Sequence, residues 1–132
     1  MVGEEGEMDD GGMPWARARE IGDRGEELVC AHVRAMGWMV LERNWRCPEG
    51  ELDVVAHDGH QLVFCEVKTR RSARFGEPVE AVGREKAHRL RRLAWAWLDA
   101  HGRRGADFRI DVFGLLSPSD APTRLTHLRG VA

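Results

Sequence analysis

Residues 50–70 read GELDVVAHDGHQLVFCEVKTR and decide the expected fold, because they place acids and a lysine inside two apolar runs. Residues 52–56 and 62–67 are rich in Leu, Val and Phe and predict two strands. The Asp58-Gly59 pair between them is typical of a two-residue hairpin turn. The stretch therefore predicts an antiparallel hairpin that carries ionisable residues.

The predicted hairpin brings two carboxylates onto one face. Side chains alternate across a strand, so Glu66 and Lys68 point to one side while Val67 points to the other. The two-residue turn sets Asp53 opposite Phe64 and diagonal to Glu66, at about 7–8 Å between backbones. Converging carboxylates repel each other unless a hard cation such as Mg²⁺ or Mn²⁺ lies between them. We therefore expect Asp53 and Glu66 to bind such a cation and Lys68 to stabilise charge during phosphodiester hydrolysis.

The spacing alone also fits a plain surface arrangement of Glu66 and Lys68 on an edge strand. Composition favours a chemical role, because eighteen of the twenty basic residues are Arg and the two lysines are Lys68 and Lys86. A lysine ammonium is a compact point charge, unlike the planar guanidinium of arginine. Both interpretations stay open on spacing and composition.

The rest of the chain predicts an α/β domain. Residues 17–36 and 79–101 show apolar residues at helical spacing, and Gly37 and Gly102 are placed to end the two helices. Three further strands are expected at residues 38–41, 108–113 and 124–128, which gives the order αβββαββ. In the second helix, Trp95 and Trp97 lie on different faces, so at most one packs centrally. In the strand that follows, Asp111 and Arg109 predict an internal ion pair.

Composition indicates one globular domain. The chain has 132 residues, of which 42% are hydrophobic and 32% are charged. Residues 1–10 hold five acids and no base, and residues 1–14 predict a disordered acidic extension ahead of a single domain at residues 15–132. The longest apolar run, residues 93–98, is far shorter than the roughly 20 residues that cross a bilayer, and no leader opens the chain. Three cysteines without C-x-x-C spacing indicate neither a disulfide framework nor a four-thiolate zinc site, so we expect a cytoplasmic protein with no membrane contact.

A basic half-chain suggests a polyanionic partner. Residues 68–104 carry eleven Lys or Arg against four acids, which suits nucleic acid, although a solvated helix face is the alternative. Phosphate contacts are expected from five basic residues and base stacking from one aromatic ring: Arg70, Arg71, Arg74, Arg84 and Lys86, with Trp45. We favour DNA over RNA as the partner.

Several motifs follow one another in a recognisable order over residues 21–128. They are Gly22, Gly25 and Glu26, then Gly37, Arg43-Asn44-Trp45-Arg46, Gly50-Glu51-Leu52-Asp53, residues 63–70, Phe75-Gly76, Pro78, Lys86 and Arg109-Ile110-Asp111-Val112. In these motifs the chain resembles the bacterial YraN-like family, whose members share the restriction-endonuclease-like PD-(D/E)XK nuclease fold.

The resemblance implies an αβββαβ core with a mixed central sheet flanked by helices. It also implies that Asp53 and Glu66 match the metal-binding acids of such nucleases and that Lys68 matches the catalytic lysine. Glu26 matches an acid in the first helix that helps to hold the metal in related junction-resolving and exonuclease-like enzymes. An ordinary helix-start acid is the alternative interpretation of Glu26.

Two functions from different classes remain open. The first is a Mg²⁺- or Mn²⁺-dependent endonuclease that is structure-selective, because no sequence-reading helix is apparent. The second is a nucleic-acid-binding module of the same fold that does no chemistry or acts only with a partner. A third hypothesis gives the acidic extension the role of covering the basic face. Paired cuts in branched DNA would require a homodimer.

Overall fold

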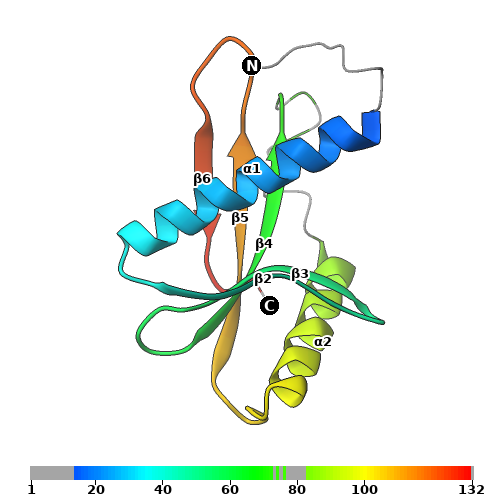
Figure 1. Cartoon of the computed structure of the whole chain (residues 1–132), viewed down its shortest axis with the longest axis vertical. Helices are drawn as coiled ribbons and strands as arrows, with labels where there is room; N and C mark the ends of the chain where they lie inside the picture. Colours follow the sequence, from blue (N-terminus) through cyan, green and yellow to red (C-terminus); the bar gives the residue numbers. More distant parts are fainter. Residues whose placement is uncertain (1–13, 73, 75, 77–82, 132) are drawn as a thin grey trace.

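The computed structural model describes residues 14–72, 74, 76 and 83–131, with the backbone alone for residues 14–22. Seven elements follow in the order αβββαββ, as expected (Figure 1). They are α1 (Pro14–Ala35), β2 (Met39–Cys47), β3 (Gly50–His57), β4 (Leu62–Arg70), α2 (Arg84–Ala100), β5 (Phe108–Leu116) and β6 (Arg124–Leu128). None of the helices in these ranges is long and apolar enough to span a membrane.

The strands form one mixed sheet in the order β2-β3-β4-β5-β6. Strands β4 and β5 are parallel, and the other neighbouring pairs are antiparallel. Two parallel neighbours need a long crossover connection, and α2 lies within it. The protein is therefore an α/β domain consistent with the restriction-endonuclease-like αβββαβ core, to which β6 adds one antiparallel edge strand.

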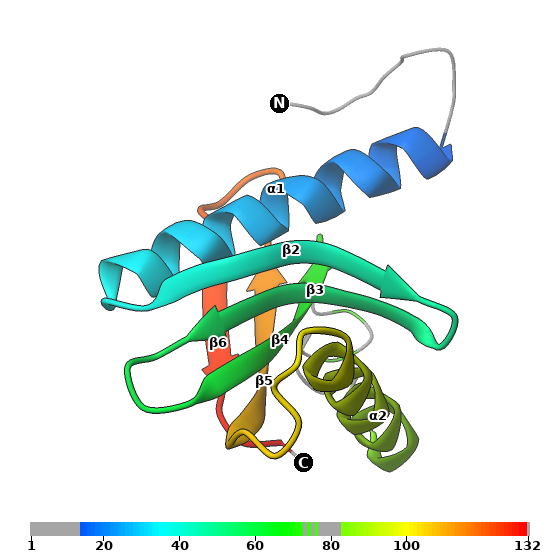
Figure 2. The same ribbon diagram turned by 60° about the horizontal axis from the view of Figure 1, so that its bottom comes forward.

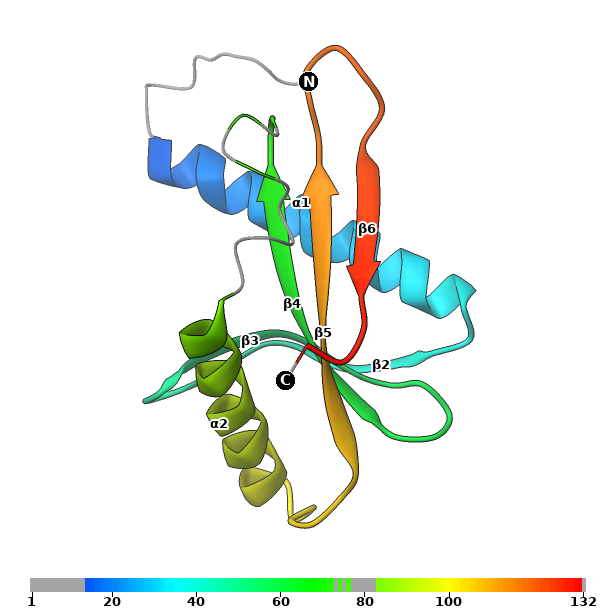
Figure 3. The ribbon, with the colours of Figure 1, turned by 180° about the vertical axis from the view of Figure 1, so that it is seen from behind.

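The two helices cover opposite faces of the sheet. Helix α1 crosses in front of the sheet in Figure 1 and behind it in Figure 3, and Figure 2 shows α1 and α2 on either side of β2 and β3. Val29 and Val33 of α1 belong to one buried cluster with Phe113. Leu90 and Trp97 of α2 belong to a second cluster on the other face. Residues of the strands thus alternate between two separate cores.

The expectation for the two tryptophans of α2 is confirmed. Trp97 is buried and its indole N–H donates a 2.9 Å hydrogen bond to Glu42 Oε1. Trp95 lies on another face of the helix and is 53% exposed. Only one of the two rings therefore contributes to the core.

The expected two-residue turn is wrong, because the hairpin closes through a four-residue loop. His57 pairs with Leu62 and Val54 pairs with Cys65, so the register lies two residues beyond the expected one. The cause is Asp58, whose Oδ1 accepts hydrogen bonds from the N–H groups of His60 and Gln61 at 2.8 and 2.9 Å. Such a side-chain acceptor stabilises a wider turn than the Asp-Gly pair alone predicts. A shift of two residues leaves every side chain on its expected face.

Several element boundaries differ from the expected ones. Helix α1 begins at Pro14, because proline is favoured in the first turn of a helix. Strand β2 extends to Cys47, because it pairs along the edge of β3 with an irregularity between Val40 and Glu42. Helix α2 begins at Arg84 after the extended Gly83, and the expected start at residue 79 lies outside the described residues. Residues 1–13, most of the expected acidic extension, also lie outside them.

The internal ion pair expected on β5 is confirmed as part of a buried network. Asp111 has no solvent exposure, and it accepts hydrogen bonds from Arg109 Nε at 3.0 Å and from the Gly130 N–H at 3.0 Å. His127 Nε2 donates to its second oxygen at 2.8 Å. Arg109 also reaches Asp58 Oδ2 at 2.7 Å. The network thus joins β5, β6 and the hairpin loop at one end of the sheet.

Candidate active site

The two acids singled out in the sequence meet where β3 and β4 separate. Their ladder ends at the pair Val54 and Cys65, one residue before Asp53. From there Asp53 Oδ2 accepts a 2.8 Å hydrogen bond from the N–H of Val67. A side-chain oxygen thus takes the place that a strand carbonyl would occupy. This local separation gives a carboxylate room to lie between two strands.

Burial and a neighbouring like charge disfavour the ionised form of Asp53. Loss of solvation, followed by the negative charge of Glu66, raises the pKa of Asp53 from 3.8 to about 8. The hydrogen bond from Val67 opposes this rise, and the charge of Glu26 adds to it. Among the described residues no lysine or arginine forms an ion pair with Asp53. Positive charge brought to this carboxylate would therefore be strongly favoured.

Glu66, in contrast, already has cationic partners. It is only 7% exposed, and its Oε2 lies 2.9 Å from Lys86 Nζ and 3.9 Å from Lys68 Nζ. Lys86 comes from the first turn of α2, so the crossover helix delivers this cation to the sheet. Burial, followed by the nearby charge of Lys86, lowers the pKa of Lys68. Two ammonium groups therefore share one buried carboxylate.

The predicted alternation along β4 is confirmed. Cys65 belongs to the core beneath α1, and Val67 packs against that core. Glu66 and Lys68 consequently point to the other face, toward Lys86 of α2. Cys65 therefore lies on the opposite face of β4 from Glu66 and Lys68, although burial and nearby negative charges, that of Asp53 included, raise the pKa of its thiol.

Glu26 of α1 lies close to this site but has its own partners. It is buried, its Oε1 lies 3.5 Å from Arg43 Nη2, and that oxygen has no hydrogen-bond partner among the described residues. Burial raises the pKa of Glu26, while Asn44 and Arg43 lower it. Helix α1 packs closely against β4 at Gly25. A Cβ at this position would collide with Thr69 Oγ1, so the close packing requires glycine.

The donor set falls short of a complete protein cage for a metal. Within the described ranges, no group of three or more His, Cys, Asp or Glu side chains is arranged to hold a metal ion. Asp53 and Glu66 are instead a pair of oxygen donors. Mg²⁺ is commonly bound by one or two carboxylates together with waters and substrate phosphates. The pair therefore fits an ion that is shared with a substrate.

Comparison with known proteins shows where this chain belongs. The sequence model of the family described as "Uncharacterised protein family UPF0102" matches residues 25–115. The chain is a member of the UPF0102 family. This result confirms the resemblance to YraN-like proteins. The matched range contains Glu26, Asp53, Glu66, Lys68 and Lys86.

Relatives in the UPF0102 family match over nearly their whole length. A UPF0102 protein of Frankia casuarinae is 49% identical over 115 residues, which cover 86% of this chain and 98% of the relative. One of Beutenbergia cavernae is 53% identical over 116 residues, covering 87% and 98%. One of Streptomyces griseus is 51% identical over 113 residues, covering 85% and 95%. The domain described here therefore corresponds to nearly the whole of these relatives.

The basic residues expected to contact phosphates differ in their surroundings. Lys86 of this UPF0102 protein forms an ion pair with Glu66, so its positive charge is part of the carboxylate site. Arg70 is half-buried at the end of β4, and its Nε has no hydrogen-bond partner within the described part of the chain. Arg71, Arg74 and Arg84 are exposed between β4 and the first turn of α2. These three side chains are therefore accessible to a large anionic partner.

Trp45 packs against the protein itself. Its ring lies edge-on to His101, with ring centroids 6.1 Å apart, and it packs against the core beneath α2. Among the tryptophans whose side chains the structure describes, it is Trp95 that has an exposed indole.

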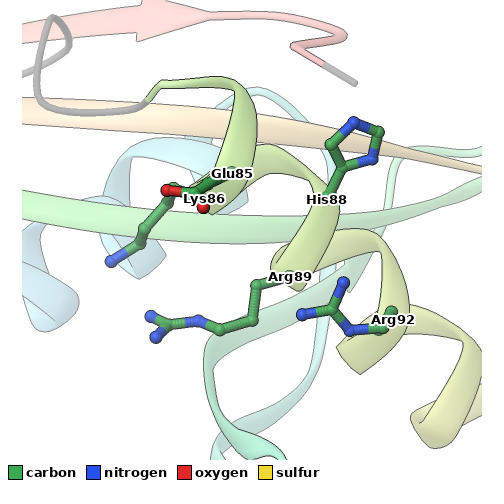
Figure 4. Close-up of a pocket in the computed structure, with 5 residues that line it drawn as sticks. All are labelled: Glu85, Lys86, His88, Arg89 and Arg92. Carbon is green, nitrogen blue, oxygen red and sulfur yellow. The ribbon is translucent and has the colours of Figure 1, made fainter.

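A basic groove on α2 was not among the features predicted from the sequence. A cavity of about 550 Å³ is lined by Glu85, Lys86, His88, Arg89 and Arg92 (Figure 4). Figure 4 shows Lys86, Arg89 and Arg92 following one another along successive turns of the helix. The spacing of three residues between these basic positions was the available signal, because it places them on one helix face.

Proposed function

We propose that this chain is a metal-dependent nuclease that hydrolyses phosphodiester bonds of nucleic acid at Asp53, Glu66 and Lys68. The observation that supports it most is the electrostatic state of Asp53. Burial and the charge of Glu66 raise its pKa to about 8, a perturbation typical of functional sites. A structural ion pair would have lowered the pKa instead.

The ligand chemistry of the site suits Mg²⁺ or Mn²⁺. Asp53 and Glu66 would hold the ion, because both offer hard carboxylate oxygens and repel each other in its absence. Glu26 would assist through its buried oxygen, which lacks a hydrogen-bond partner among the described residues. When bound, such an ion supplies Lewis acidity toward the phosphoryl group and lowers the pKa of its water.

The lysines would act on the charge of the reacting group. Lys68 carries its ammonium beside Glu66 in a half-buried setting, where a positive charge stabilises developing oxyanions more strongly than it does in water. Lys86, now 2.9 Å from Glu66, would turn to substrate phosphates once another cation neutralises that carboxylate. Arg70, Arg71, Arg74 and Arg84 would hold flanking phosphates without reading sequence. We favour DNA as the substrate, cut according to its shape.

One observation favours a second candidate, a nucleic-acid-binding module without catalysis. The ion pair between Lys86 and Glu66 neutralises a proposed metal ligand from within the chain. The same ion pair would stabilise a fold whose basic surface binds nucleic acid and performs no chemistry.

A cleavage assay tests the proposal. The purified protein is incubated with labelled linear, single-stranded, flapped and branched DNA and RNA in Mn²⁺, Mg²⁺ or EDTA. We expect cleavage that requires metal and is lost in the Asp53→Ala/Glu66→Ala double variant. The matched control is Glu51→Ala, since Glu51 lies on the same strand and pairs with the exposed Arg46.

Metal affinity gives an independent readout. Mn²⁺ titration by calorimetry should show binding to the wild type that is lost in Asp53→Ala and in Glu66→Ala. Unchanged affinity in both variants would refute the assignment of ligands. Silence of wild type and double variant on every substrate, with both binding nucleic acid, would favour the binding module. Paired cuts in branched DNA would imply a homodimer, which gel filtration with the substrate would detect.

A further inference from the structure

The outward surface of α2 carries two adjoining cavities. The first begins at Lys86, which contacts Glu66. His88, Arg89 and Arg92 follow on the same cavity wall and are exposed. A second cavity, of about 440 Å³, adjoins the first at Arg92, which lines both. Together the two cavities extend from Lys86 to the distal half of the helix.

The second cavity ends on an exposed indole. Trp95 lines it and is 53% exposed. The guanidinium of Arg91 lies 5.9 Å from the centre of the Trp95 ring and 5.5 Å from that of Phe108. Arg91 thus supports one side of the indole, and the ring retains exposed surface for another flat group. A partly exposed aromatic ring beside arginines is typical of proteins that stack nucleobases.

Charge in the first cavity favours an anion, because its lining holds three cations, Lys86, Arg89 and Arg92, against one acid, Glu85. The second cavity adds Glu49 and the ion pair of Asp99 with Arg104. From Lys86 to Trp95 the helix rises nine residues, or about 13.5 Å at 1.5 Å per residue, and makes about two and a half turns. A bound strand of a few nucleotides would therefore wrap around the helix past Arg89 and Arg92 to reach Trp95. A duplex could meet the arginines through its phosphates. Its internal bases are stacked on each other, so only an unpaired base can reach the face of Trp95.

We propose that α2 carries a binding track for single-stranded nucleic acid, in which Arg89 and Arg92 contact phosphates and Trp95 stacks on an unpaired base. This inference rests on the proposed function, because the track supplies the unpaired strand to the carboxylate site. It narrows the substrate to nucleic acid that has a single-stranded segment, such as a tail or a flap. The track itself requires no metal and no chemistry.

Binding in EDTA tests the track apart from catalysis. The full-length protein is titrated into a fluorescent 20-nucleotide oligothymidine and into a duplex of the same length, and anisotropy is recorded at several salt concentrations. We expect Trp95→Ala to weaken single-strand binding about 10-fold and Trp95→Phe to retain most of the affinity. Duplex binding should change little in either variant. The plot of log K against log salt has a negative slope. In Arg89→Ala/Arg92→Ala this slope should become less negative by about 1.4, or 0.7 for each lost phosphate contact.

A matched control is Arg34→Ala, because Arg34 is exposed at the end of α1, which covers the opposite face of the sheet. This variant should bind like the wild type. Wild-type protein that fails to bind the single strand, or Trp95→Ala that binds it normally, would overturn the track. Equal losses for single strand and duplex in Trp95→Ala would do the same.

The two proposals fail in different ways. Normal single-strand binding that depends on Trp95, without cleavage in any metal, would leave the track standing and refute the nuclease. Metal-dependent cleavage with no effect of Trp95→Ala on single-strand binding would leave the nuclease standing and refute the track.

Discussion

Replacing Asp53 with asparagine should stabilise the protein at pH 8, although it removes a proposed metal ligand. The pKa of Asp53 rises from 3.8 to about 8 on folding. The folded protein therefore binds this proton more tightly than the unfolded chain, so the free energy of unfolding decreases as pH rises from about 4 to about 8. An amide carries no charge to desolvate, and its oxygen can still accept the hydrogen bond from Val67.

The size of the effect follows from the pKa. One pKa unit corresponds to about 1.4 kcal/mol, so the interval between 3.8 and about 8 sets an upper limit of about 6 kcal/mol on the stability lost through Asp53 by pH 8. Water enters a half-buried site and raises its effective dielectric constant, so we expect about 1–2 kcal/mol for Asp53→Asn in practice.

Urea unfolding followed by tryptophan fluorescence, without divalent cations, would measure this difference. We expect Asp53→Asn to exceed the wild type in free energy of unfolding at pH 8, and by a smaller margin at pH 5. Glu51→Gln is the control, because its side chain is partly exposed on the same strand. A variant no more stable than the wild type at pH 8, or an equal difference at both pH values, would refute the electrostatic reasoning. Mn²⁺ should then stabilise the wild type and leave Asp53→Asn unchanged.

Three further changes test other parts of the structure. Lys68→Ala should lower the cleavage rate about 100-fold without unfolding the protein. Lys68→Arg should not restore the rate, because a guanidinium cannot replace a compact ammonium. Cleavage at the wild-type rate in either variant would contradict this role. Gly25→Ala should cost about 1–3 kcal/mol, since its Cβ would lie 2.4 Å from Thr69 Oγ1, and melting curves should show partial recovery in Gly25→Ala/Thr69→Ala. Asp111→Ala should cost about 3–5 kcal/mol by removing the buried acceptor that Arg109, His127 and the Gly130 N–H share. A loss below about 1 kcal/mol in urea unfolding would show that the network contributes little.

Local pattern was enough to predict the order of the elements and the faces of β4. Alternation placed Glu66 opposite to Val67, and helical spacing separated Trp95 from Trp97. Both results depend on backbone geometry alone, which repeats along a strand or a helix. The pairing of Asp111 with Arg109 was likewise predictable, because a charged pair on an apolar strand is costly unless its members meet.

Interactions between segments that are distant along the chain could not be predicted from the sequence. The turn at Asp58 widens around a side-chain acceptor that Arg109, fifty-one residues away, holds in place. Lys86 reaches Glu66 because the first turn of α2 lies over that part of the sheet. The separation of β3 and β4 at Asp53 depends on a hydrogen bond to Val67, fourteen residues away. Register and ion pairing therefore required the tertiary structure.

That same hydrogen bond makes one peptide group a reporter of the whole site. The N–H of Val67 donates to Asp53 Oδ2 at 2.8 Å, and a charged acceptor polarises an amide more strongly than a neutral one. In a proton–nitrogen correlation spectrum, the Val67 resonance should move as Asp53 loses its proton and move again when a cation withdraws electron density from the carboxylate. The chemical shift of a single backbone nucleus would thus follow the occupancy of this centre without substrate or turnover.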